Sequence, residues 1–352
     1  MERSIYRNEL TALKKAMAGV KNTPFTIFAK VVTLATMNMR YEKVAFNSHI
    51  NKHPYLLTRG IIREALQEFR LFTDIALIES GNKSISAFKN LILEKKHEEL
   101  WQEIWSRHNE KEFQEFVELK KFRLKINGLK RYIAGKDCAD FGCGNGSFSF
   151  ALLEFGARSV TGIDFGEKSV RYARQVARIR GIDKKAKFYV ANVFDSKLPA
   201  DSCDFAVSNG VFHHLRPKKI PLALKEVARV LRKGGWLWYY VDGKNAISMD
   251  LFDTSVEVLK GVDLSLIEKI LKCMNVRRNK MVHLMDGMNA TYIHSTYHEV
   301  TALLSKCGFN KFKRLTGGSD TDFDLDRIKS DPYGREKFGE GDLRILCQLA
   351  EK

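Results

Sequence analysis

The feature of this sequence that most restricts its fold is a change of hydrophobic periodicity near Lys136. Beyond it, short apolar segments of strand length alternate with segments whose apolar residues recur three and four positions apart. This alternation is typical of a parallel sheet built from βα units. We predict strands over residues 137–141, 159–163, 187–190, 205–208 and 235–241, with helices over 148–155, 168–180 and 221–232.

The segment after residue 241 is predicted to leave the sheet as an insertion and then to return and complete it. We expect a helical insertion over 244–298, a helix over 299–307, and two strands over 309–315 and 343–349 that form an antiparallel hairpin. The predicted fold class is therefore α/β, with a Rossmann-like, seven-stranded and mostly parallel sheet.

Residues 1–130 have helical periodicity throughout and predict an N-terminal domain or lid before a second domain over 131–352. Trp101 and Trp105 are interpreted as core packing rather than as a base-stacking platform. Because the last helix runs almost directly into the first strand, the linker is too short for a freely tethered domain. The predicted helices are 9–17, a mixed segment 25–39, 59–78, 84–93 and 97–129.

Composition excludes several classes of protein. The six cysteines form no CxxC pair, which argues against a zinc site or a disulfide framework and favours a reduced, cytoplasmic location. No stretch approaches 18 apolar residues, so no membrane span is predicted. The net charge of +17 would suit nucleic acid, an anionic surface or an acidic substrate. Because no run of five basic residues occurs, solvated helix faces are favoured, with a nucleic-acid groove as the alternative.

The strongest chemical signal is the segment 140–146, Asp-Phe-Gly-Cys-Gly-Asn-Gly, between a predicted strand and a predicted helix. Glycines there allow the backbone to pass close to a ligand. Asp164 ends the second predicted strand, where its carboxylate can accept both hydroxyls of a ribose. This spacing would also suit NAD. However, the carboxylate of Asp140 would repel a pyrophosphate, whereas it suits a cofactor that carries an ammonium and a sulfonium.

Five ordered motifs make residues 136–349 resemble the class I S-adenosylmethionine-dependent methyltransferases, particularly the group with the ubiquinone and menaquinone biosynthesis enzymes. After the glycine segment and Asp164 come 191–199 (ANVFDSKLP), 209–215 (NGVFHHL) and 229–235 (RVLRKGG). The resemblance implies a methyltransferase fold and S-adenosyl-L-methionine as cofactor.

The resemblance also implies the roles of individual residues. Asp140 precedes the loop, Gly142, Gly144 and Gly146 would line the methionine part, and Asp164 with the neighbouring Phe165 would lie at the ribose. Asn192 and the Val193 amide would read adenine, and the Asn209 carbonyl would contact the ammonium. The family usually has Asp at position 192, so we expect a weaker, uncharged contact there.

Candidate acceptor-site residues follow the fourth predicted strand and close the insertion. His213 or His214 could act as a general base, which a hydroxyl acceptor requires, although family members with this pair often use it structurally. Tyr292, His294 and Tyr297 would form a substrate wall. The alternative for that segment is a helix N-cap at Ser295 or Thr296, and the two readings are compatible.

Two other motifs are interpreted as structural. Asp320, Asp322, Asp324 and Asp326 have the spacing with which a calcium loop begins, but Leu325 occupies the position where that loop needs glycine. We therefore expect a solvated acidic loop and no metal site. The segment 330–333, Ser-Asp-Pro-Tyr, predicts a turn with proline at its second position.

Three functions are compatible with these features. The leading hypothesis is methyl transfer to an oxygen or nitrogen atom of a small molecule, with the N-terminal helices as lid and substrate selector. The second is an RNA methyltransferase whose basic helical domain binds phosphates. The third is a binding protein that keeps the cofactor fold without transferring a methyl group. The acceptor, the pathway and the oligomeric state are not determined by the sequence.

Overall fold

The computed structural model of this chain describes residues 2–79, 110–289, 292–320 and 322–350. It divides into two compact units, which we describe separately. The helical unit comprises Met1–Leu93, Asn245–Ala290 and Arg327–Gly339, and the sheet unit comprises Glu94–Lys244, Thr291–Asp326 and Glu340–Lys352. The predicted helix 84–93, the start of the predicted helix 97–129, and Trp101 and Trp105 lie outside the described residues.

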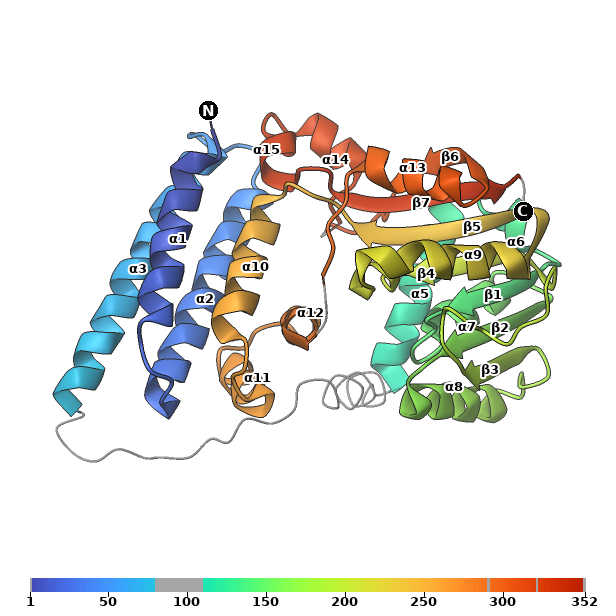
Figure 1. The fold of residues 1–352 in the computed structure, drawn as a ribbon, viewed down its shortest axis with the longest axis horizontal. Coiled ribbons are helices and arrows are strands. Elements are labelled where there is room, and N and C mark those ends of the chain that lie inside the picture. The colour runs from blue at the N-terminus through green and yellow to red at the C-terminus, as the bar shows by residue number, and fades with distance from the viewer. Residues whose placement is uncertain (1, 80–109, 290–291, 321, 351–352) are drawn as a thin grey trace. The chain divides into compact units, whose positions relative to one another are not determined.

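The sheet unit contains a seven-stranded sheet in the order β3-β2-β1-β4-β5-β7-β6 (Figure 1). The first five strands are parallel, as the strand and helix alternation predicted. Their bounds differ from the predicted ones by a few residues, most of all in β5, which begins where the preceding helix was expected to end. The strands are β1 Asp137–Phe141, β2 Ser159–Asp164, β3 Ala186–Val190, β4 Cys203–Asn209, β5 Leu231–Asp242, β6 Phe309–Arg314 and β7 Asp342–Leu349.

The direction of the strand order reverses between β1 and β4. β1 pairs with β2 on one side and with β4 on the other, so the connections leaving these strands run to opposite sides. A crevice opens at the carboxyl ends of the strands at such a point, and ligands bind there. Topology alone therefore places the segment 140–146 and the residues after Asn209 at one edge of the sheet.

Helices cover both faces of the sheet (Figure 1). On one face, side chains of α5, α6, α7 and α8 pack with sheet residues such as Phe148 against Trp238. On the other face, α9 and α13 pack over a second core that contains Phe141 and Phe212. These helices are α5 Glu110–Ile126, α6 Lys130–Ile133, α7 Ser147–Glu154, α8 Glu167–Ile179, α9 Ile220–Val230 and α13 Tyr297–Lys306.

The C-terminal strands are antiparallel, as predicted, but they do not form a simple hairpin. β7 is the inner strand and pairs with both β5 and β6. The connection between β6 and β7 leaves the sheet unit and contains two short helices, α14 Leu325–Ser330 and α15 Gly334–Phe338. Between them lies the predicted turn, where the Tyr333 amide donates to Asp331 Oδ1 at 2.8 Å.

The helical unit joins three parts of the chain that are distant in sequence. α10 Ile247–Leu259 packs against α1 Ser4–Ala18 and α2 Pro24–Ala45 (Figure 1). Arg7 of α1 forms an ion pair of 3.0 Å with Asp250 of α10. The Lys337 ammonium, whose side chain is fully buried, donates to Asn47 O and Asp331 Oδ2, both at 2.7 Å. The remaining helices of this unit are α3 Pro54–Glu79, α11 Leu264–Cys273 and α12 Arg278–Asn289.

This division differs from the predicted boundary at residue 130. Helix α5 belongs to the sheet unit, because Phe113 and Val117 share a core with α7 and α8. The insertion after β5 belongs with the N-terminal helices rather than with the sheet. Among the described helices, none is long and apolar enough to cross a membrane.

Candidate active site

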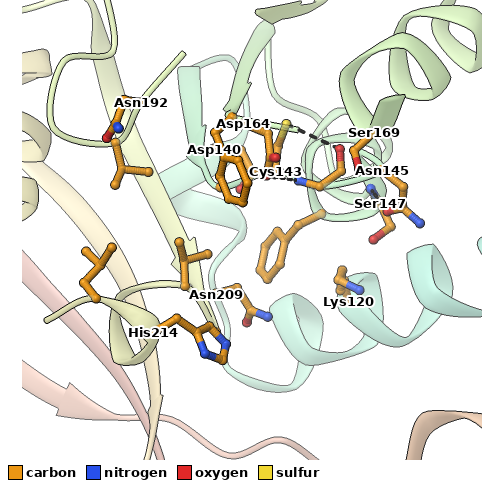
Figure 2. Close-up of a pocket in the computed structure, with 18 of the residues that line it drawn as sticks. Lys120, Asp140, Cys143, Asn145, Ser147, Asp164, Ser169, Asn192, Asn209 and His214 are labelled. Carbon is orange, nitrogen blue, oxygen red and sulfur yellow. Dashed lines mark hydrogen bonds between the residues drawn. The ribbon is translucent and has the colours of Figure 1, made fainter. Parts of the chain in front are cut away.

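A cavity of about 250 Å³ lies at the carboxyl ends of β1 and β4 in the sheet unit (Figure 2). Its wall is built from the glycine segment, the end of β2, the loop after β3 and the segment after β4. Most of the predicted cofactor residues line it. These lining residues are Asp140, Gly142, Gly144, Asp164, Phe165, Asn192, Val193 and Asn209, together with His214.

The glycine segment needs its glycines for two different reasons. Gly142, Gly144 and Gly146 all have positive φ, at 78°, 51° and 82°. A Cβ at Gly142 would lie 2.5 Å from the Val211 side chain, so any larger residue would displace the cavity wall. Gly146 does not line the cavity. A Cβ there would meet the rings of Phe150 and Phe188 at 3.0 Å, so this glycine serves the packing of α7.

Asp164, the predicted ribose ligand, is a carboxylate that lines the cavity at the end of β2. Its Oδ2 accepts the Gly144 N–H at 2.9 Å, and its Oδ1 accepts the Gly166 N–H at 2.8 Å. Burial raises the pKa of Asp164, while these two backbone donors act in the opposite direction. A carboxylate has about four lone-pair sites, so roughly two remain for a ligand diol.

Asp140 is buried, with 2% of its surface exposed, and its Oδ2 accepts a hydrogen bond from Ser149 Oγ at 2.7 Å. Burial raises the pKa of this carboxyl to about 7, with a further contribution from Asp164, against the opposing effects of Ser149 and Lys120. A cationic ligand group nearby would favour its ionised form.

The loop after β3, which carries the predicted adenine contacts Asn192 and Val193, forms another part of the cavity wall. Asn192 Oδ1 accepts the Phe194 N–H at 3.0 Å, so the predicted adenine contact would use the remaining lone pair of that oxygen. The loop is held in place by Glu226, which accepts hydrogen bonds from the Ser196 N–H and from Arg229, each at 2.8 Å. The Phe165 ring is 44% exposed beside it.

The segment after β4 carries the two histidines. His214 lines the cavity, whereas His213 lies behind it with 4% of its surface exposed. Their Nε2 atoms are 3.0 Å apart. His213 Nδ1 accepts the Asp242 N–H at 3.3 Å and lies 3.7 Å from the Asp242 carboxylate. Burial lowers the pKa of His213, and the Asp242 charge opposes that shift.

Only part of the predicted substrate wall reaches these histidines. The Tyr292 ring stacks on His213 with centroids 4.7 Å apart and meets His214 edge-on at 4.8 Å. His294 lies next to Tyr292, with centroids 5.4 Å apart. Tyr297 packs instead against the core under α13, where Thr296 is the N-cap and forms a capping box with Glu299. None of the three tyrosine and histidine side chains of this segment lines the described cavity.

The expectation of a solvated acidic loop is wrong for two of its four residues. Asp322 and Asp324 are 6% and 8% exposed, because both form ion pairs with the buried Arg344 of β7, at 2.7 and 3.1 Å. Arg123 of α5 also pairs with Asp322, at 2.9 Å. Among the described residues, no cluster of acidic, histidine or cysteine side chains has the arrangement of a metal site.

Sequence reasoning missed two kinds of functional residue. Lys120 of α5 lines the cavity beside Asn145 and Ser147, although it lies outside every motif (Figure 2). Asp242 stands behind His213 at the end of β5. The only available signal for Asp242 was its position at the carboxyl end of a predicted strand, and Lys120 gave none, because the tertiary fold alone brings α5 to this edge.

The residues of the cavity fit the cofactor that the motifs imply. Gly142 and Gly144 carry no side chain, so their backbone can contact a ligand directly. Asp164 keeps lone pairs for further hydrogen bonds, and the carboxyl of Asp140 lines the cavity beside the loop. Asn209 closes this side of the cavity at the end of β4, where its Oδ1 accepts from Trp238 Nε1 at 3.1 Å.

Comparison with known proteins gives the same assignment for the central part of the chain. Residues 139–239 match the family described as "Methyltransferase domain". The chain is 46% identical over 72 residues to the 23S rRNA (uracil(1939)-C(5))-methyltransferase RlmD of Neisseria lactamica, covering 20% of this chain and 15% of that protein. It is 28% identical over 137 residues to a ubiquinone biosynthesis O-methyltransferase of Thiobacillus denitrificans, covering 39% and 57%.

Among solved structures, a protein described as a SAM-dependent methyltransferase from Methanosarcina mazei aligns with a TM-score of 0.42 and 23% identity, covering 64% of this chain and 97% of that one. The chain spans less than two thirds of the length of the curated relatives named above. Residues 139–239 therefore match a methyltransferase domain, and in this part the chain is similar to the class I S-adenosylmethionine-dependent methyltransferases.

Proposed function

We propose that this protein transfers a methyl group from S-adenosylmethionine to an oxygen or nitrogen atom of a small-molecule acceptor. The observation that carries the proposal is the single cavity wall that combines the glycine loop, Asp164 and His214. The cofactor supplies a methyl group activated by a sulfonium sulfur. The protein aligns the acceptor with it and excludes water.

We propose His214 as the group that takes the proton from a hydroxyl acceptor, with His213 and Asp242 as positioning residues. In the resting arrangement the Asp242 N–H donates to His213 Nδ1, so the neutral His213 ring carries its proton on Nε2 and donates it to His214. Proton uptake by His214 requires the opposite tautomer, in which His213 Nδ1–H faces the Asp242 carboxylate 3.7 Å away. That carboxylate then stabilises the positive charge of the pair.

The binding part of this proposal is tested by calorimetry with S-adenosylmethionine and S-adenosylhomocysteine. We expect micromolar affinity for both, and absence of heat at high micromolar protein contradicts the proposal. The acceptor is sought by incubating metabolite extracts with the methyl-labelled cofactor. A protein that binds the cofactor but labels nothing in extracts of its own cells would fit the third hypothesis, a binding protein without transfer.

The RNA alternative rests on the net charge of +17. Scattered lysines release few counterions, so we expect weak binding to RNA at low salt that disappears near about 0.15 M salt. Submicromolar affinity for RNA at that salt concentration would place RNA first as the acceptor.

We further propose that the helical unit selects the acceptor. The chain enters this unit after Lys244, two residues beyond the carboxyl end of β5, and returns from it at Thr291 beside Tyr292. Lys244 and Tyr292, between which the chain runs through the helical unit, both belong to the sheet unit, and there Tyr292 stacks on His213. A cytoplasmic location, proposed from the cysteine pattern, is compatible with six cysteines that are all free thiols.

A further inference from the structure

The cavity contains two hydrogen-bond donors that the proposed function does not use. Lys120, on α5, is partly buried, and Asn145, in the glycine segment, is 1% exposed. Both line the cavity on the side away from Asn192 (Figure 2). We propose that Lys120 and Asn145 together bind the carboxylate of the cofactor's methionine part. This inference rests on the proposed function, and it makes α5, outside the matched domain, a part of the cofactor site.

The first observation is that both donors lack acceptors. Asn145 Nδ2 has no hydrogen-bond partner in the part of the chain that the structure describes, while Asn145 Oδ1 accepts the Ser147 N–H at 3.1 Å. Among the described residues, none accepts a hydrogen bond from Lys120 Nζ, whose recorded contact is the Phe116 ring at 5.0 Å. The next lysine, Lys121, pairs with Glu118 and Glu154 at 3.0 and 2.8 Å. The buried Asn145 amide nitrogen without an acceptor is unfavourable, and a ligand acceptor would relieve that cost.

The second observation is the sign of the charge. The positively charged groups of the cofactor, its ammonium and its sulfonium, would be repelled by the Lys120 ammonium. The adenine and the ribose have their predicted partners in Asn192 and Asp164. The carboxylate is therefore the ligand group that fits an ammonium with an amide donor beside it.

The charged groups around Lys120 add a pH signature. Burial and the Arg123 guanidinium lower the pKa of Lys120 to about 7, against the opposing effect of Asp140. The pKa of Asp140 is raised to about 7 by its own burial. A bound carboxylate would draw a proton onto Lys120, and a bound ammonium would drive a proton off Asp140. These two changes have opposite signs and largely cancel near pH 7.

The test compares two ligands by calorimetry, S-adenosylhomocysteine and 5′-methylthioadenosine, which lacks the amino-acid part. We expect Lys120→Met to weaken S-adenosylhomocysteine about ten- to a hundredfold and to leave 5′-methylthioadenosine unchanged. Asn145→Asp keeps the oxygen that caps Ser147 but replaces the donor with an anion, so it should show the same selectivity. Lys125→Met, an exposed position on the same helix, should change neither ligand.

The outcomes separate this inference from the proposed function. A wild-type protein that binds neither ligand contradicts the proposed function. If the wild type binds both, equal affinity of Lys120→Met and wild type for S-adenosylhomocysteine overturns the carboxylate subsite. An equal loss for both ligands overturns it too, because that result indicates a structural role. Repeating the titration in buffers of different ionisation enthalpy should reveal net proton release for Lys120→Met near pH 7 and almost none for the wild type.

Discussion

At the scale of single residues, the site depends on atoms that serve two purposes. Asp164 holds the glycine segment through the Gly144 N–H and, in our proposal, holds the ribose with its remaining lone pairs. His213 also makes two contacts with one ring, because its Nε2 contacts His214 Nε2 and its face stacks on the Tyr292 ring. A substitution at either position changes the shape of the wall as well as the contact with the ligand.

The role of Asp164 can be separated from its role in the loop. Asp164→Ala should weaken S-adenosylhomocysteine by roughly 1 to 3 kcal/mol, the cost of leaving buried ligand hydroxyls unpaired. A ligand without the ribose hydroxyls should lose a similar amount of binding free energy with the wild-type protein. When this ligand is combined with Asp164→Ala, the two losses should not add, because both changes remove the same contact. Full additivity in calorimetry would show that Asp164 acts only through the loop. Asp183→Ala, at an exposed position, is the matched control.

From the sequence, a residue could be placed at the cavity where a short motif contains both the residue and its neighbours. The segment 140–146 and Asp164 are such cases, because the strand register brings Phe141 beside Ile163. Tyr297 packs in the core under α13, and Lys120 lines the cavity with residues at least 20 positions further along the chain, so no short motif could place either of them.

At the scale of elements, β7 organises the C-terminal part of the sheet unit through Arg344. Its guanidinium forms ion pairs with Asp322, Asp324 and Asp342, and its own pKa is raised although burial acts to lower it. Burial also acts to raise the pKa of Asp324, but Thr316 Oγ1 and the loop amides outweigh it and hold the pKa below its ordinary value. The acidic run thus fixes the loop after β6 against β7 and α5.

Removal of Arg344 should therefore be strongly destabilising. Arg344→Met removes the guanidinium that pairs with Asp324 and Asp342 and leaves Asp322 with Arg123 alone, and we expect a loss of about 3 to 5 kcal/mol in the free energy of unfolding near pH 8. The carboxyl pKa values rise when the cation is removed, so these groups take up protons as the pH falls. The loss should consequently be smaller at pH 5 than at pH 8 in urea unfolding.

The matched control for Arg344 is an arginine in an exposed ion pair. Arg158 forms an ion pair with Asp137, and its own side chain is 62% exposed. Exposed pairs of this kind contribute about 0 to 1 kcal/mol to the free energy of unfolding, so Arg158→Met should cost no more than that. A loss for Arg344→Met that is the same at both pH values, or no greater than that of the control, would contradict the buried network.

At the scale of the whole molecule, the helical unit is assembled from three separate stretches of chain. The inner face of α10, with Leu251, Phe252 and Leu259, is buried within this unit, and α10 packs against both α1 and α2. Residues 245–290 therefore do not have a complete core of their own without the first three helices.

This arrangement predicts the result of a truncation. Deleting residues 1–93 should leave an aggregating protein, because the apolar face of α10 loses its cover. If that face is masked by a solubilising fusion, we expect cofactor binding to persist in calorimetry and methyl transfer to the native acceptor to be lost. A truncated protein that stays monomeric by light scattering and retains full turnover would contradict both the helical unit and its role in acceptor selection.

The sequence by itself determined the parallel sheet and the alternation of strands and helices over residues 136–242, and it indicated which glycines and carboxylates lie at the carboxyl ends of the strands. These features follow from local periodicity and from motifs whose parts lie close together along the chain. Only the tertiary structure decided that α5 joins the sheet unit, that the insertion completes the helical unit, that Lys120 reaches the cavity, and that Asp242 and Arg344 acquire their partners. Burial and ion pairing between distant segments depend on which faces meet in space, and no local pattern in the chain encodes that.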